Sequence, residues 1–248
     1  MNYPLYLFFG LAPSIIWLCY FLRKDVHPES NREVLKVFFY GALIALPAII
    51  IEVVIYKIIF ALNLPQKLDL FLNVFIGISL TEELLKYYVV RLNILHSAEL
   101  DEPIDIMLYM IIAALGFASV ENLLLILSNA GTLGISSTTE TFRYLFTLSS
   151  FRFLSATFFH ALASGLFGYF LALSFFEIRK RTKYFIIGLG LAILFHGLYD
   201  YPLLALDTSE NSIKPAMIVI AILAILAVAV TIGFQKVKKM ASVCKLNK

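Results

Sequence analysis

Three charged residues lie within one turn of a stretch that otherwise suits a lipid bilayer. Glu82, Glu83 and Lys86 interrupt the apolar run 68–90. A single charge at the centre of a bilayer costs at least ~2.5 kcal/mol on insertion scales. On a helix Lys86 follows Glu82 by four residues and Glu83 by three, so its ammonium can reach either carboxylate. Such a costly cluster predicts a functional site at the middle of a membrane.

Three further apolar runs carry acidic, amide or imidazole side chains. The next run contains Glu121 and Asn122, the one after it contains His160, and the sixth contains His196 and Asp200. The last two residues are four apart, so they share a helix face, and the Asp200 carboxylate can orient the ring of His196. With each run centred in the bilayer, these carboxylates and imidazoles and the paired glutamates fall within about 10 Å of the midplane.

These side chains could hydrolyse a peptide bond. A carboxylate removed from water holds a proton more tightly and becomes a better base for an attacking water molecule. Imidazoles can stabilise the developing oxyanion and deliver a proton to the leaving group. No serine in these runs stands in a recognisable nucleophile motif. The candidate catalytic residues are Glu82, Glu83, Lys86, Glu121, His160, His196 and Asp200.

Each candidate has an expected role. Glu82 or Glu83 would activate water, and Lys86 would orient and tune that pair. The two histidines would stabilise the oxyanion, Asp200 would orient His196, and Glu121 would complete the polar cavity. The sequence leaves open which glutamate is the base, because adjacent side chains project about 100° apart on a helix.

The same residues could instead hold a metal ion. Two histidines with a carboxylate suit Zn²⁺ or another divalent cation, and the ligands would be Glu83, His160 and His196. The spacing does not follow the H-E-x-x-H zinc pattern, so such a site would be gathered from separate helices. We therefore rank a glutamate mechanism without a cofactor first and keep a divalent metal as the alternative.

The composition predicts a polytopic membrane protein. Of the 248 residues 60% are hydrophobic and only 15% are charged, whereas soluble domains are about one quarter charged. One membrane domain, 1–248, accounts for the whole chain, with the motif-bearing core at about 68–206. The net charge of +3 is spread over loops and gives no reason to expect nucleic acid as a partner. Cys19 and Cys244 are too few to indicate a disulfide scaffold, and no cleavable signal peptide is evident.

Seven apolar runs are long enough to cross a bilayer, and all should be helical because a strand edge in lipid leaves backbone groups unsatisfied. They cover 3–22, 36–61, 68–90, 105–128, 146–176, 184–206 and 215–234. The loops 23–36, 177–183 and 235–248 are basic and the alternate loops are poor in lysine and arginine. This asymmetry predicts an external amino terminus and a cytoplasmic carboxyl terminus. The polar loop 129–143 would then lie outside, either as a lip over the site or as an ordinary connector.

The chain resembles the PrsW-type intramembrane proteases and, more distantly, the CAAX prenyl endopeptidase and Abi superfamily. The resemblance rests on Glu82-Glu83-x-x-Lys86, Gly116-Phe117-Ala-x-x-Glu121-Asn122, His160 and His196-x-x-x-Asp200, in order on four successive runs. Tyr87 and Asp200 fit the PrsW branch better than the CAAX pattern, which has arginine and asparagine there. Leu123, Leu124 and Leu125 stand where the PrsW family often has a tyrosine.

This resemblance implies a multi-pass protease of a prokaryotic cytoplasmic membrane. Its substrate would be a single-span membrane protein, and the reaction would be the first cut in an anti-sigma factor. It also implies that Glu82, Glu83 and His160 matter most, with His196 in the same site. Two alternatives remain: a divalent-cation or proton-coupled transporter using the same cluster, and a non-catalytic membrane scaffold.

Overall fold

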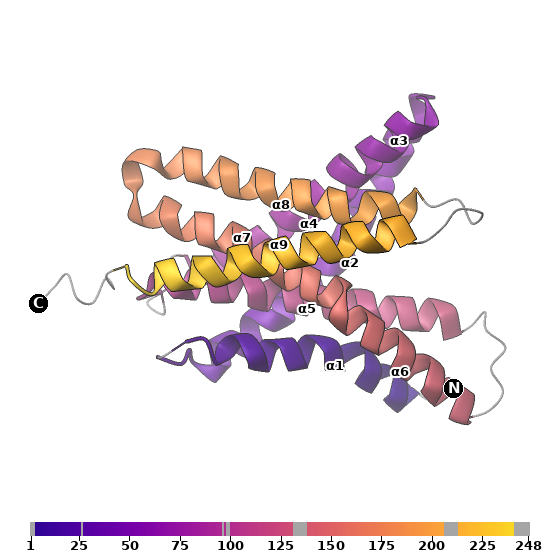
Figure 1. Cartoon of the computed structure of the whole chain (residues 1–248), viewed down its shortest axis with the longest axis horizontal. Helices are drawn as coiled ribbons and strands as arrows, with labels where there is room; N and C mark the ends of the chain where they lie inside the picture. Colours follow the sequence, from indigo (N-terminus) through magenta and orange to yellow (C-terminus); the bar gives the residue numbers. More distant parts are fainter. Residues whose placement is uncertain are drawn as a thin grey trace, which may run out of the picture.

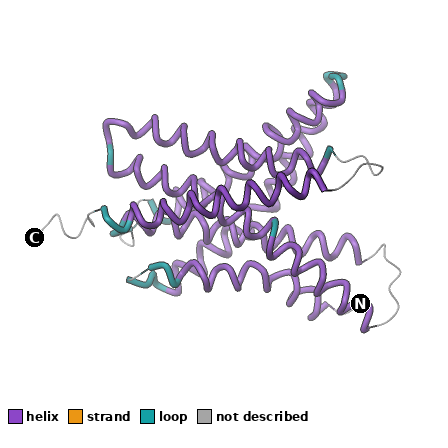
Figure 2. Tube along the Cα trace, viewed as in Figure 1, coloured by secondary structure: helices purple, strands orange, loops and turns teal. Residues whose placement is uncertain are grey.

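A computed structural model describes residues 3–25, 27–95, 97, 100–130, 138–205 and 213–240. Within these residues all regular secondary structure is helical (Figure 2), as the sequence predicts. Residues 131–137 of the predicted external lip, and Cys244, lie outside the described part. The helices are α1 (Tyr3–Leu22), α2 (Asn31–Ala61), α3 (Gln66–Leu72), η1 (Asn73–Leu80), α4 (Thr81–Asn93), α5 (Pro103–Ala130), α6 (Thr138–Leu154), α7 (Ala156–Phe176), η2 (Ile178–Lys180), α8 (Arg181–Leu204) and α9 (Ile213–Val237).

Six helical stretches in the described residues are long and apolar enough to cross a membrane, where the sequence predicts seven. They are Tyr3–Leu22, Asn31–Ala61, Pro103–Asn129, Thr139–Phe176, Ile178–Leu204 and Ile213–Val237. The expected span 68–90 is not among them, although α3, η1 and α4 follow one another without a gap across it. The charged residues of α4 lower the mean hydropathy of this segment. The same charged residues are the candidates for catalysis.

Helix α5 forms the centre of the bundle (Figure 1). No residue from Ile106 to Leu115 is more than 1% exposed, as expected for a helix that is apolar on every side. Helices α1, α2, α4, α7 and α9 all contact it. Helix α5 therefore provides the fixed frame against which the polar helices are placed.

The close crossing of α2 and α5 depends on two glycines. Gly116 of α5 lies against the backbone carbonyl of Phe38 in α2, and Gly41 of α2 lies against the carbonyl of Ala113 in α5. A methyl group at either position would overlap the facing backbone. These glycines let α2 and α5 approach closely, and α5 carries Glu121 a little more than one turn after Gly116.

The paired glutamates begin an α-helix directly after a π-helical segment. The residues of η1 form the wider helical turns in which hydrogen bonds reach five residues along the chain. Ser79 in this segment donates its hydroxyl to the Val74 carbonyl at 2.8 Å. The π-helical turns rotate the start of α4 relative to a continuous α-helix, so they set which faces of Glu82 and Glu83 meet the bundle.

The expected span 146–176 is broken. Helix α6 ends at Leu154 and α7 begins at Ala156, and Ser155 between them has φ −114° and ψ −93°, outside the helical region. Helices α7 and α8 then form an antiparallel pair, while α3 projects away from the body of the molecule (Figure 1). The break allows residues at the end of α6 to turn toward the same cavity as the first turns of α7.

Candidate active site

The paired glutamates of α4 point into the protein interior. Glu82 is 3% exposed, and both Glu83 and Lys86 are fully buried. Helix α4 packs against α2, α5 and α8, so its first turn is enclosed on three sides. Buried carboxylates require compensating charges and hydrogen bonds, and the neighbouring helices provide them.

Lys86 links the two carboxylates to an imidazole. Its Nζ donates to Glu82 Oε2 and to Glu83 Oε1, both at 2.9 Å, and lies 2.9 Å from His160 Nδ1. An ammonium group has three hydrogens, so these three contacts use all of them. The same Nζ lies 4.5 Å from the centre of the Phe117 ring, which closes the apolar side of the ammonium.

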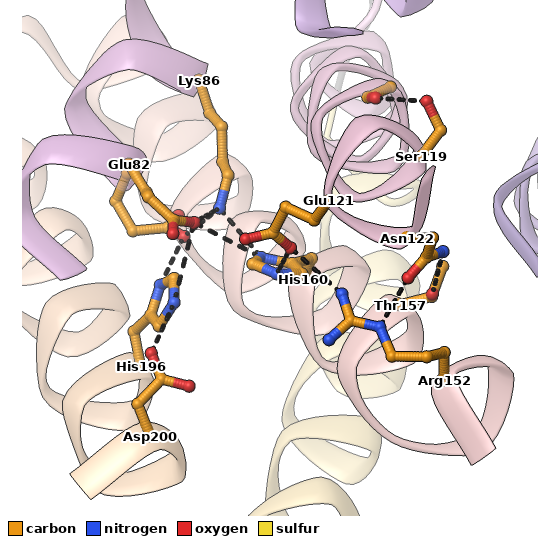
Figure 3. Close-up of polar contacts among 12 residues, drawn as sticks. Glu82, Lys86, Ser119, Glu121, Asn122, Arg152, Thr157, His160, His196 and Asp200 are labelled. Carbon is orange, nitrogen blue, oxygen red and sulfur yellow. Dashed lines mark hydrogen bonds and ion pairs between the residues drawn. The ribbon is translucent and has the colours of Figure 1, made fainter. Parts of the chain in front are cut away.

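The contacts of His160 define its tautomer. Since Nδ1 accepts from Lys86, the ring hydrogen lies on Nε2, which donates to Glu121 Oε2 at 2.7 Å. Arg152 in turn donates from a terminal nitrogen to Glu121 Oε2 at 3.3 Å. Glu121 therefore orients His160, and Arg152 holds Glu121 in place (Figure 3).

His196 lies between three carboxylates. Its Nδ1 is 3.0 Å from Glu83 Oε1, and its Nε2 is 3.3 Å from Asp200 Oδ2 and 3.7 Å from Glu82 Oε2. An imidazolium would donate to carboxylates on both sides. A neutral ring that donates from Nδ1 to Glu83 would leave the lone pair of Nε2 facing the Asp200 carboxylate. A cation would then have to lie between Nε2 and Asp200. The three carboxylates around His196 therefore favour a positive charge at Nε2, carried either by a proton or by a bound cation.

Glu82 and Glu83 have different surroundings. Glu83 Oε1 accepts from Lys86 and His196, and Ser164 donates to Glu83 Oε2 at 2.9 Å. Both of its oxygens are thus engaged, and it is fully buried. Glu82 lies in the wall of a cavity, and Glu83 is not among the residues lining that cavity. Only Glu82 of the pair is placed to meet a substrate.

The cavity has a volume of about 330 Å³ and is lined by residues of α2, η1, α4, α5, α6, α7 and α8, with Ser155 between α6 and α7. Apolar side chains from α6 and α8 flank the polar ones. Its lining residues are Glu52, Ile78, Glu82, Glu121, Phe151, Arg152, Ser155, Ala156, His160, His196, Tyr199, Asp200, Leu203 and Leu204. Most of the predicted catalytic side chains therefore face one space of a size that accommodates a short segment of peptide.

The chain matches known proteins over most of its length. The family model described as PrsW family intramembrane metalloprotease matches residues 29–232. The chain belongs to the PrsW family. Protease PrsW of Geobacillus kaustophilus is 31% identical over 197 residues, which is 79% of this chain and 78% of the relative. The proteins of the same name from Oceanobacillus iheyensis and Bacillus subtilis are each 29% identical, over 87% and 84% of this chain and 91% and 87% of their own. No solved structure matches significantly.

Membership of the PrsW family makes the chain an intramembrane protease and a multi-span membrane protein, as its motifs predict. The structure brings together all seven residues that the sequence proposes for catalysis, from α4, α5, α7 and α8. The predicted contact between His196 and Asp200 is present at 3.3 Å. The individual catalytic roles of these residues remain predictions.

The metal in the family description has a matching set of ligands. Among the described residues, Glu82, His160 and His196 have ligand atoms that all lie within 4.8 Å of one another. Two imidazoles and one carboxylate form a donor set that zinc proteases use. Glu83 contacts His196 through Nδ1, and Glu121 contacts His160 through Nε2. Carboxylates contact the second ring nitrogen of metal-bound histidines in the same way. These residues fit a divalent cation.

The ligand set differs from the sequence prediction at one position. The sequence predicts Glu83 as the carboxylate ligand, and the structure places Glu82 with the two histidines. The reason is that Glu83 is occupied by Lys86, His196 and Ser164. Among the described residues of the site the carboxylates also outnumber the cationic side chains: Glu82, Glu83, Glu121 and Asp200 accompany Lys86 and Arg152. A divalent cation would balance this excess of negative charge.

Sequence reasoning assigned no site role to three of the residues that complete this site. Arg152 contacts Glu121 and Asn122. Ser164 donates to Glu83, and Glu52 lines the cavity. Ser164 follows His160 by four residues, a spacing that places both on one helix face and could have identified it.

Proposed function

We propose that this protease cuts a single-span membrane protein at a peptide bond that enters the membrane, as the first cut in an anti-sigma-factor-like substrate. The observation that carries the proposal is the cavity itself. Glu82, His160 and His196 line a space within a bundle of membrane helices, and Phe151, Leu203 and Leu204 are among the apolar residues that line the same space. A site of this kind suits a substrate presented from the bilayer.

The side chains around the cavity support lateral access. Phe151 at the end of α6 is 65% exposed, and Leu204 at the end of α8 is 55% exposed. Both line the cavity, as does the less exposed Leu203. In a bilayer such side chains contact lipid, so an apolar substrate helix can reach them without crossing water. Its unwound end would then meet the polar wall formed by Glu82, His160 and His196.

Without a bound metal, the reaction would be an attack by water on the peptide carbonyl, with this chain's own side chains moving the protons. Glu82 takes the proton of the attacking water on the carboxylate oxygen that does not face Lys86. Protonated His196 stabilises the carbonyl oxygen as charge develops on it and passes a proton to the leaving amine. His160 donates its ring hydrogen to Glu121 and accepts from Lys86, so it holds Lys86 in place. Asp200 orients His196, and Glu121 orients His160.

The glutamate-only mechanism that the sequence ranks first becomes the less favoured alternative, because the family is described as metalloproteases and the donor set fits. The metal would be held by Glu82, His160 and His196. When bound, a divalent cation supplies a Lewis acid that polarises the carbonyl and lowers the pKa of water. Lys86 and Glu83 then form the frame that holds the cluster together and do not touch the substrate.

The topology belongs to the same proposal. Basic residues concentrate in the loops on one side of the chain, so we infer a cytoplasmic carboxyl terminus and an external amino terminus. The cavity residues at the end of α8 then lie toward the outer side, because α8 ends there, and those at the end of α6 lie deeper, because α6 starts there. The scissile bond would lie in the outer half of the bacterial cytoplasmic membrane.

The test uses purified protein in liposomes with a panel of single-span substrates that carry a short external stalk. Cleavage is compared for wild type, Glu82→Gln, Glu83→Gln and His160→Ala, each with and without a strong chelator and then with added Zn²⁺. Glu177→Gln is the matched control, because Glu177 is an exposed carboxylate that pairs only with Lys180 and Tyr184 among the described contacts.

We expect Glu82→Gln and His160→Ala to abolish cleavage, Glu83→Gln to weaken it, and the control to retain it. Loss on chelation with recovery in Zn²⁺ would support the metal. Cleavage that survives chelation in wild type would return the glutamate mechanism to first place. Metal flux across the liposome membrane, without cleavage of any substrate, would favour the transporter and refute the proposal.

A further inference from the structure

A second cavity lies on the other side of α7 from the active site. It has a volume of about 560 Å³, and its α7 residues, Phe158 and Leu162, project about 160° away from His160 on the helix. Its walls come from α1, the α6–α7 junction and α9. The lining residues are Ile16, Trp17, Tyr20, Phe21, Lys24, Phe153, Phe158, Leu162, Ala227, Val230, Thr231, Phe234, Gln235 and Lys238. We call this space the α1–α9 groove.

The floor of the α1–α9 groove is fixed in place by Trp17. The indole ring stacks on Phe158 at 4.2 Å and on Phe153 at 4.9 Å between ring centres. Its Nε1 donates to the Phe153 carbonyl at 2.8 Å. The tryptophan is therefore held by two aromatic rings and a hydrogen bond, and the groove is preformed.

The charge of the groove is confined to one end. Lys24 follows the end of α1, and Lys238 follows the end of α9. Lys24 Nζ lies 4.5 Å from the centre of the Tyr20 ring. In the described part of the chain no carboxylate forms an ion pair with either lysine. The groove thus has an apolar body and a cationic mouth, which is the complement of an amphiphile with a negative head.

The length of the groove matches one leaflet. Along α1 its lining extends from Ile16 to Lys24, which is about 12 Å, and along α9 from Ala227 to Lys238, which is about 16 Å. One leaflet contributes roughly 15 Å of hydrocarbon. A substrate helix would cross both leaflets and would gain nothing from two lysines at one end.

We propose that the α1–α9 groove binds an anionic phospholipid. One acyl chain lies along Trp17, Phe158 and Val230, and the phosphate lies between the ammonium groups of Lys24 and Lys238. Basic pockets between membrane helices recognise anionic head groups in this manner. The site is separate from the catalytic cavity and does not depend on which bond the protease cuts.

The chain contains a natural probe for this site, because Trp17 is its single tryptophan. The full-length protein is reconstituted in lipid nanodiscs of zwitterionic lipid, and Trp17 fluorescence is measured while brominated phosphatidylglycerol or brominated phosphatidylcholine is introduced. Bromine quenches tryptophan only on contact. We expect the anionic lipid to quench at a lower mole fraction, by on the order of tenfold, since each lysine near a membrane surface contributes ~1 kcal/mol.

The decisive comparison is between two double variants. Lys24→Gln with Lys238→Gln removes the cationic mouth and should abolish the preference while the maximal quenching stays the same. Lys183→Gln with Lys239→Gln removes two lysines that do not line the groove and should preserve it. Lys24→Arg with Lys238→Arg should also preserve it, which separates loss of charge from loss of fold. Equal quenching by the two lipids in wild type, or a preference that survives removal of Lys24 and Lys238, would overturn the proposal.

Discussion

The ammonium of Lys86 lies 2.9 Å from Nδ1 of His160. It also lies 2.9 Å from Glu82 Oε2, so it contacts two of the three residues that would hold a metal. The chain's own cation therefore occupies part of the space in which a divalent cation would be bound. Metal binding would require the Nζ of Lys86 to withdraw toward Glu83, so we expect the lysine to compete with the metal for this space.

Replacing Lys86 with methionine tests this competition. Without metal, Lys86→Met leaves Glu82 and Glu83 buried with no lysine between them, and loss of one partner from a buried ion pair costs ~3–5 kcal/mol. With metal, the variant has one competitor fewer. We expect the thermal midpoint of the variant to be well below that of wild type in chelator and to rise more than that of wild type when Zn²⁺ is added.

The control for this variant is Lys183→Met, which removes an exposed lysine at the start of α8. Its midpoint should follow that of wild type in both conditions. If Zn²⁺ raised the midpoints of Lys86→Met and wild type by the same amount, Lys86 would not compete with the metal.

Arg152 should position His160 through Glu121. Its side chain donates to Glu121 Oε2 at 3.3 Å and to the Asn122 amide oxygen, and Glu121 Oε2 accepts from His160 Nε2. We expect Arg152→Gln to lower kcat by about 10- to 100-fold, the usual cost of losing a group that orients a ligand, with little change in KM. Arg152→Lys should recover part of the loss, because it restores charge without the two-pronged geometry.

The matched control is Arg179→Gln, which removes an exposed arginine of η2. It should leave kcat unchanged. Should Arg152→Gln change KM alone, the arginine would contact the substrate and would not act through Glu121.

Residue type and depth were sufficient to predict the composition of the site. Glu82, Glu121, His160 and His196 are expensive in lipid, and each occurs near the centre of its run. Helices cross a bilayer roughly along its normal, so residues at equal depth on packed helices tend to lie close together. The sequence therefore identifies the members of the cluster without knowing how the helices pack.

Side-chain direction could not be predicted in the same way. The π-helical segment η1 changes the helical phase just before Glu82, so a sequence read at 3.6 residues per turn does not reveal which glutamate faces the cavity. The break at Ser155 likewise brings Arg152 into contact with Glu121, which a continuous helix over this span does not predict. Both features depend on local backbone geometry, and neither leaves a compositional signal.

The crossing of α2 and α5 should tolerate no side chain at Gly116. A Cβ there would overlap the Phe38 carbonyl, which is backbone and cannot rotate away. We expect Gly116→Ala to lower the free energy of unfolding by about 1–3 kcal/mol, the range for overpacking, and to lower activity by shifting Glu121. Gly190 in α8 is the control, because a Cβ at that position meets nothing within 4 Å.

Gly190→Ala should leave stability unchanged or raise it by up to ~1 kcal/mol, since alanine favours a helix more than glycine does. Denaturant or thermal unfolding in the same detergent gives both values. Equal effects at the two glycines would mean that helix propensity, and not the close crossing, determines the cost at Gly116.

Glu29, in the segment between α1 and α2, should make stability depend on pH. Burial raises the pKa of Glu29 above its ordinary value of 4.5, and the nearby carboxylates of Asp25 and Asp101 raise it further, while hydrogen bonds with Tyr109 and Asp105 offset part of the effect. The folded protein thus binds this proton more tightly than the unfolded chain does. Its contribution to stability is complete below about pH 4.5 and is lost as the pH rises through the folded-state pKa.

A neutral side chain at this position should remove that loss. Glu29→Gln keeps an oxygen that can accept from Tyr109, which donates to Glu29 Oε2 at 2.7 Å. We expect the difference in thermal midpoint between Glu29→Gln and wild type to be small near pH 4.5 and to grow in favour of the variant toward neutral pH. Glu177→Gln, which removes an exposed carboxylate, is the control for the change of residue type. A constant difference for Glu29→Gln across this range would show that the carboxylate stays ionised in the folded protein and that its neighbours do not oppose its charge.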